Sequence, residues 1–213
     1  MLQHQLTKWH AGLILWGDRS SLDMLYEFIF KVNEQSCYLD DKESFLLYFA
    51  GDVRHAKQGS RKKSHSYIDT DDQCLVYGVE QLWPMLLTQV AVLRHAMAFM
   101  STDKNDQAVM FGLEALIELA LRNAIPASAD QVLSSMERIA NLPFEHISDA
   151  IYSRCQYFVG LKGKKRLLEL PAVMQSLDPM YHFWGERALD PAPGYLRPSV
   201  FELDQEEWPD FRW

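Results

Sequence analysis

The chain has 213 residues, 48% of them apolar, and a formal net charge of −8 from 21 basic and 29 acidic side chains. This length and apolar content suffice for one good hydrophobic core or two small ones. The acidic balance argues against a nucleic-acid-binding protein, which would carry a basic stripe, and favours cationic partners instead.

Neither a membrane anchor nor an export signal is predicted. The N-terminus lacks the basic and apolar regions of a signal peptide. Residues 83–100 have the length of a membrane span, but Gln89, Arg94 and His95 within them predict a buried helix of a soluble domain. The three scattered cysteines form no CxxC pair and are typical of reduced thiols, so we expect a cytoplasmic protein.

The first hundred residues predict a small sheet covered by helices. The apolar run 11–16 is typical of a buried strand. Helical spacing of apolar residues predicts helices over about 20–34 and 42–58, the first capped by Ser20 and the second ended by Gly59.

A hairpin and a long helix complete this part. Alternating residues on both sides of a Thr-Asp-Asp turn at 70–72 predict a hairpin over 64–79. Pro84 suits the first turn of a helix over 84–100, which is apolar on nearly every side and should be wrapped by other elements.

The second half is predicted to be helical. Short connections should make consecutive helices antiparallel neighbours, and Ser128 with Gln131 forms a capping box for the second of them. These helices are expected over 106–123, 129–141, 144–160 and 164–177.

Together these patterns predict an α+β protein in three parts. Residues 1–103 form an α+β domain, and residues 104–178 form a helical domain or a helical extension that packs on it. Residues 179–213 are rich in proline and predict an extended C-terminal arm.

This arm is both acidic and aromatic. Residues 199–213 hold five acidic side chains and one arginine, with aromatic residues between them. Two interpretations are open: the arm packs against the helices of its own chain, or it contacts a partner such as a second copy of the chain. The candidate partner-binding residues are Phe201, Glu206, Glu207, Trp208, Phe211 and Trp213.

Asp52, Arg54 and His55 stand within one turn of a predicted helix. At about 100° per residue, Asp52 falls on the apolar face, Arg54 points the opposite way and His55 lies on the flank. A buried carboxylate needs hydrogen-bond donors, such as backbone amides, Arg61 or Arg19. Two interpretations stay open: Asp52 pins a neighbouring loop, or Asp52 and His55 act as a general acid or base.

A basic turn follows this helix. Arg54, together with Arg61, Lys62 and Lys63, is a candidate anion-binding group, and a solvated basic turn is the alternative. No zinc-protease, phosphate-loop, nucleophile-elbow, dinucleotide-binding or calcium-loop motif is present, and no two histidines have helical pair spacing. The sequence therefore predicts no metal site and no cofactor.

Twelve residues carry a family resemblance over about residues 10–100. They form a Gly-Asp start of the first helix, an Asp-x-Arg-His-Ala-x-x-Gly-Ser-Arg signature and a Leu-Trp-Pro helix start. These residues are Gly12, Gly17, Asp18, Asp52, Arg54, His55, Ala56, Gly59, Arg61, Leu82, Trp83 and Pro84. The pattern resembles a bacterial domain family of unknown function, which implies a shared fold and a boundary near 101–105 but supplies no reaction.

Two classes of function are compatible with these observations. The first is a non-enzymatic, acidic interaction protein of the bacterial cytoplasm, for example an immunity-type inhibitor that neutralises a cationic toxin. The second is an enzyme or binding protein for an anionic small molecule or nucleotide, which would use the region of Asp52, Arg54, His55 and Arg61.

Overall fold

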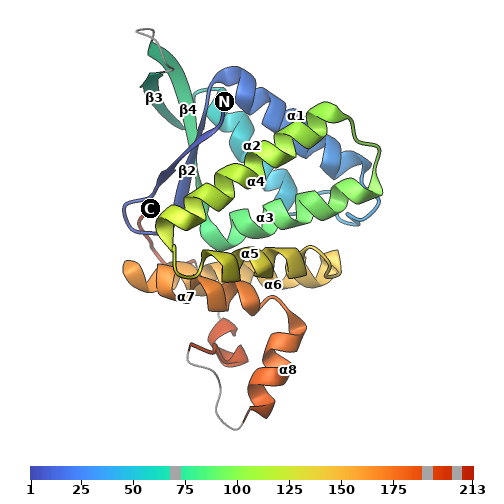
Figure 1. The fold of residues 1–213 in the computed structure, drawn as a ribbon, viewed down its shortest axis with the longest axis vertical. Coiled ribbons are helices and arrows are strands. Elements are labelled where there is room, and N and C mark those ends of the chain that lie inside the picture. The colour runs from blue at the N-terminus through green and yellow to red at the C-terminus, as the bar shows by residue number, and fades with distance from the viewer. Residues whose placement is uncertain (68–72, 189–193, 203–207) are drawn as a thin grey trace.

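The computed structural model describes residues 1–67, 73–188, 194–202 and 208–213. The protein is α+β: a four-stranded antiparallel sheet with N-terminal helices is followed by an all-helical second half (Figure 1). The strand order is β1-β2-β4-β3, with β1 at Gln3–Leu6, β2 at Gly12–Gly17, β3 at Lys62–Tyr67 and β4 at Gln73–Leu82.

The predicted strand and hairpin are confirmed. β3 pairs antiparallel with β4, and β2 pairs antiparallel along its whole length with residues 77–82 of β4. The predicted turn at 70–72 lies outside the described residues. β1 was not predicted, because its sequence Gln-His-Gln-Leu has no β-branched residue and alternates only weakly in polarity.

The two N-terminal helices match their predictions, with one correction. Helix α1 is Arg19–Gln35 and helix α2 is Phe45–Lys57. The N-cap of α1 is Asp18 and not Ser20, because the Asp18 carboxylate accepts the Ser21 backbone N–H at 2.8 Å. Gly59 has a φ of 76° after α2, as expected for a glycine that ends a helix.

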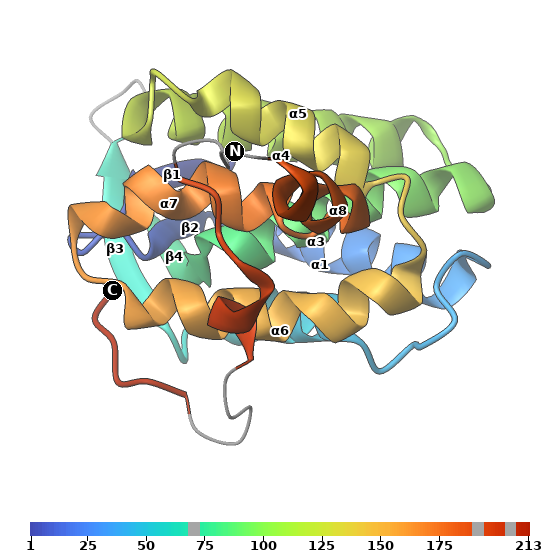
Figure 2. The ribbon, with the colours of Figure 1, turned by 90° about the horizontal axis from the view of Figure 1, so that it is seen from below.

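The long apolar helix lies at the centre of the fold. Helix α3, Trp83–Ala96, is buried along nearly all of its length, and a 3₁₀ turn at Met97–Phe99 follows it. It contacts α4, α5, α6 and α7, so the expected wrapping is confirmed. In Figure 2, α5, α7 and α6 run roughly side by side as one layer, with α3 behind them.

The four expected helices of the second half are present. They are α4 (Lys104–Ala124), α5 (Ala129–Ile139), α6 (Phe144–Gly160) and α7 (Lys164–Gln175). Ser128 precedes α5, but its side chain makes no capping hydrogen bond, so the predicted capping box was wrong. The capping box belongs to α4, where Asp103 and Asp106 exchange side-chain and backbone hydrogen bonds.

The prediction of an extended arm from residue 179 was wrong at its beginning. Pro179–Arg187 form helix α8, because proline is tolerated in a first turn and Asp178 caps it through the Met180 amide. A 3₁₀ turn follows at Pro198–Phe201. Residues 208–213, which we call the C-terminal segment, contain neither helix nor strand.

One continuous hydrophobic cluster joins the two halves, from Leu13 on β2 through Leu86 on α3 to Leu170 on α7. The division into 1–103, 104–178 and 179–213 remains a prediction. Within the described ranges, no helix combines the length and apolar character that a membrane crossing requires.

Candidate functional site

A cavity of about 450 Å³ lies where α2, the β3–β4 hairpin and the C-terminal segment meet. It brings together two groups of residues that the sequence singled out separately: part of the basic turn after α2, and three aromatic residues of the arm. We call it the Arg61 pocket and define it by Asp52, Arg61, Lys62, Gln81, Gln89 and Phe211.

The turn after α2 directs Arg61 into this pocket. Gly59 adopts a positive φ, which reverses the chain, and the amide of Ser60 donates to the His55 carbonyl at 3.2 Å. Arg61 therefore lies beside α2, and its guanidinium nitrogen donates to Asp52 Oδ1 at 2.9 Å. The expected pairing between Asp52 and Arg61 is thus present.

The expected burial of Asp52 was wrong. Its side chain is 36% exposed, because the face of α2 that carries Tyr48 and Asp52 borders the pocket and is not covered there by the core. Its second oxygen, Oδ2, accepts a hydrogen bond from Gln81 Nε2 at 3.3 Å. Both carboxylate oxygens are therefore engaged by side-chain donors.

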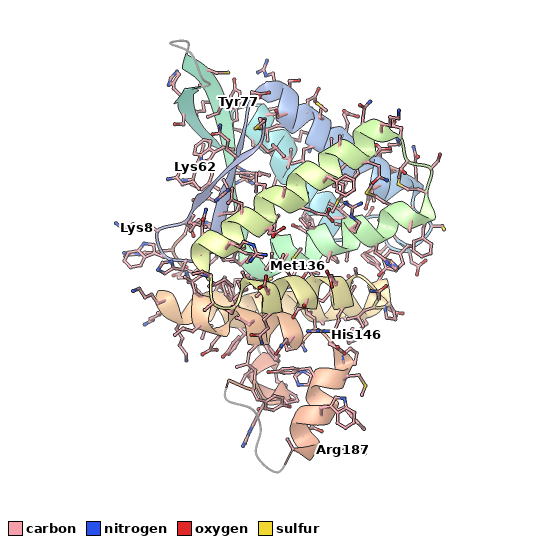
Figure 3. All side chains as sticks on the ribbon, in the orientation of Figure 1. Lys8, Lys62, Tyr77, Met136, His146 and Arg187 are labelled. Atoms are coloured by element: carbon pink, nitrogen blue, oxygen red, sulfur yellow. The ribbon has the colours of Figure 1, made fainter. Side chains whose placement is uncertain are left out.

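Of the other basic candidates, only Lys62 lies in the pocket with Arg61. Lys62 lines the pocket and pairs with Glu80 at 3.1 Å; Figure 3 shows it on β3, at the opposite end of the molecule from Arg187 on α8. Arg54, His55 and Lys63 are exposed and are not among the residues that line the pocket. The structure therefore does not join Asp52 and His55 into one site.

The C-terminal segment supplies the aromatic wall. Trp208, Phe211 and Trp213 line the pocket, and the rings of the last two meet edge-on with centroids 5.1 Å apart. The segment is held to its own chain, since the Trp9 amide donates to the Trp213 carbonyl at 3.2 Å. Figure 1 shows the C-terminus beside the loop that joins β1 to β2.

The remaining arm candidates lie elsewhere. Phe201 is 6% exposed, so its ring is not free for a partner, and it packs on Tyr157 and Arg154. Glu206 and Glu207 lie outside the described residues.

Two buried glutamines in the pocket lining were not predicted as site residues. Gln81 and Gln89 are 4% and 2% exposed. Gln89 Nε2 donates to the Phe45 carbonyl at 2.9 Å, whereas Gln89 Oε1 has no partner among the described residues. The sequence did contain a signal for Gln89, because it is a polar residue within the largely apolar α3. A buried polar group of this kind needs a hydrogen-bond partner or a functional explanation.

No cluster of metal-binding side chains is found in the described part of the chain. No group of three or more His, Cys, Asp or Glu side chains there is arranged to hold an ion. The pocket offers paired charges, aromatic rings and side-chain amides, which are groups for binding a small polar molecule.

Fold and pocket together define an α+β protein with a cavity of mixed polar and aromatic lining. The chain belongs to the family described as "Domain of unknown function (DUF6904)", whose model matches residues 2–213. The family match therefore extends well beyond the stretch of about 10–100 in which the resemblance was noticed. Comparison with curated proteins and with solved structures gave no significant match.

Proposed function

We propose that this protein binds an anionic small molecule with a flat ring, such as a nucleotide, in the Arg61 pocket. The observation that carries the proposal is that cations and aromatic rings line one cavity. Asp52 and Arg61, two of the four residues that the sequence suggested for this function, line the pocket together with Lys62. Arg54 and His55, the other two, have no role in the proposed site.

The cations can exchange their present partners for a ligand. The side chains of Arg61 and Lys62 are 50% and 43% exposed, and each is paired with a carboxylate on the pocket lining. Exposed pairs of this kind contribute only about 0–1 kcal/mol. An incoming phosphate or carboxylate can therefore displace Asp52 or Glu80 at small cost and gain a charge-assisted, bidentate contact with Arg61.

The aromatic wall suits a planar group. Stacking of a base on an aromatic side chain is typically worth about 1–3 kcal/mol, and Trp208, Phe211 and Trp213 offer rings next to the cations. The amides of Gln81 and Gln89 add hydrogen-bonding groups near the centre of the cavity.

We expect adenosine monophosphate to bind more tightly than adenosine, and R61Q to weaken binding of the monophosphate by about tenfold, the value of one charge-assisted hydrogen bond. R54Q is the matched control, because Arg54 is exposed and is not among the pocket residues. Isothermal titration calorimetry measures both. Absence of saturable binding, or equal losses in R61Q and R54Q, would contradict the proposal.

We also propose, as a second candidate function, binding of a basic protein surface such as that of a cationic toxin. A groove of about 630 Å³ between α1 and α4 favours it, because five carboxylates and one lysine line it. The lysine, Lys31, is already paired with Asp106 at 2.6 Å and Asp103 at 3.5 Å. Glu27 and Glu34 extend the negative surface at this groove.

Charge reversal tests this second function. We expect the double variant E27K/E34K to lose a basic partner that the wild-type protein retains from extracts of its host, and raised salt to release that partner. E137K, which changes an exposed glutamate of α5 outside the groove, should retain it. Affinity capture with mass spectrometry distinguishes these results, and a partner that E27K/E34K still retains would rule out this groove.

A further inference from the structure

The turn between α6 and α7 concentrates positive charge on an acidic chain. Residues 162–166 read Lys-Gly-Lys-Lys-Arg, so four of five side chains are cationic, while the whole chain carries −8. They lie at the N-terminus of α7, whose first turn contains no acidic residue. The helix dipole is positive at this end, so the cations and the dipole repel one another unless an anion lies between them.

The backbone at this helix start is open. Gly163 has a φ of 53°, a conformation that favours glycine, and a Cβ placed on it would meet no atom within 4 Å. Within the described ranges, the amides of Gly163 and Lys164 have no acceptor, although the next two amides donate to the carbonyls of Lys162 and Gly163. Two amide donors therefore remain at a positive helix end.

A cavity of about 750 Å³ borders this turn. It is lined by Trp9, Lys162, Gly163, Arg166, Phe211 and Arg212, with Asp210 as the carboxylate in its lining, and we call it the Gly163 cavity. The lining carries three cations against that one carboxylate. Figure 2 shows the α6–α7 turn beside the C-terminus, which explains how residues of both segments border the same cavity.

Arg166 supplies an observation that is independent of the helix end. It is 4% exposed, and its guanidinium donates to the carbonyls of Trp9 at 3.0 Å, Arg212 at 2.9 Å and Val159 at 2.8 Å. Its Nε atom is buried and has no partner within the described part of the chain. Burial lowers the pKa of this arginine, but arginine stays charged in proteins.

We propose that the Gly163 cavity is a second anion site, which binds a phosphate group at the N-terminus of α7. Lys162 and the free amide of Gly163 line the cavity and are its binding groups, and the buried Arg166 adds a positive charge in the cavity wall. Phe211 lines both this cavity and the Arg61 pocket, so the C-terminal segment lies between the two. The phosphate belongs either to a soluble molecule or to a lipid headgroup that is a phosphomonoester, such as phosphatidic acid, and both sources present the same terminal phosphate oxygens.

Titration with inorganic phosphate at constant ionic strength tests the soluble source. We expect saturable binding to the wild-type protein and a loss of about tenfold or more in K162E, because the reversed charge faces the anion. K104E is the matched control, since Lys104 is an exposed lysine at the first position of another helix, α4. The same loss is expected when K162E is introduced in the R61Q background, where Arg61 can no longer bind phosphate in the other cavity.

Sedimentation with phosphatidylcholine vesicles, with and without phosphatidic acid, tests the lipid source. Retention on phosphatidic acid vesicles that K162E abolishes and K104E preserves would support the site with a lipid ligand. The proposal is overturned if neither phosphate nor these vesicles bind, or if K162E and K104E behave alike. Adenosine monophosphate binding that depends on Arg61 can survive either outcome, so the two proposals fail independently.

Discussion

Replacement of Arg166 by methionine is expected to lower the free energy of unfolding by about 3 kcal/mol. Three backbone carbonyls would lose a charged donor, and an unsatisfied buried acceptor costs roughly 1–3 kcal/mol. Part of this loss is offset, because methionine removes a charge whose burial is itself unfavourable. The carbonyls belong to the β1–β2 loop, the end of α6 and the C-terminal segment, so one side chain joins three distant parts of the chain.

Urea unfolding of R166M measures this loss, and R122M is the control. Arg122 also pairs with two partners, Glu118 and Asp130, but its side chain is 47% exposed, so its loss should cost less than about 1 kcal/mol. Hydrogen exchange at the Trp9 amide, which donates to Trp213, should accelerate selectively in R166M. Equal stability of R166M and R122M would show that Arg166 does not hold the C-terminal segment.

Local patterns were sufficient to predict most of the fold. The helical spacing of apolar residues located α1 to α7 to within a few residues, because each of these helices buries one face or, for α3, nearly all faces. β1 and α8 were missed for a related reason. The side chains of β1 are exposed or half-buried, and α8 buries none of its residues, so neither leaves a clear apolar pattern.

The candidate site was predicted only in part, because its geometry depends on segments far apart in sequence. A helical projection correctly separated Asp52 from Arg54, yet it could not reveal that the face of Asp52 borders a cavity and not packed core. The aromatic wall comes from residues 208–213, about 150 positions after Arg61. The burial of Arg166 could not be predicted either, because it follows three lysines near the start of a helix, a pattern typical of exposed residues.

The family signature is explained largely by folding. Leu82 pairs with Gly12 across β4 and β2, and the next amide, that of Trp83, donates to the Ala11 carbonyl at 3.0 Å. Gly59 makes the chain reversal that brings Arg61 back to Asp52. These residues build the sheet, the start of α3 and the turn, which gives them a structural role, while Asp52 and Arg61 also present charges to the pocket.

Replacement of Trp83 by alanine is accordingly expected to lower the free energy of unfolding by about 3–5 kcal/mol. Trp83 is fully buried at the junction of β4 and α3, where the sheet meets the central helix. Alanine would leave a large cavity there, whereas W83F retains most of the ring volume and should cost about half as much.

Thermal and urea unfolding compare the two variants, and adenosine monophosphate titration shows whether the residue also acts at the Arg61 pocket. Because Trp83 is not among the pocket residues, W83F should bind the nucleotide within about twofold of the wild-type protein. A W83F protein that keeps its stability but loses nucleotide binding would contradict the structural interpretation of the Leu-Trp-Pro motif. It would also imply that the side chain of Trp83 contributes to the pocket, whose lining already includes the neighbouring Leu82 and Met85.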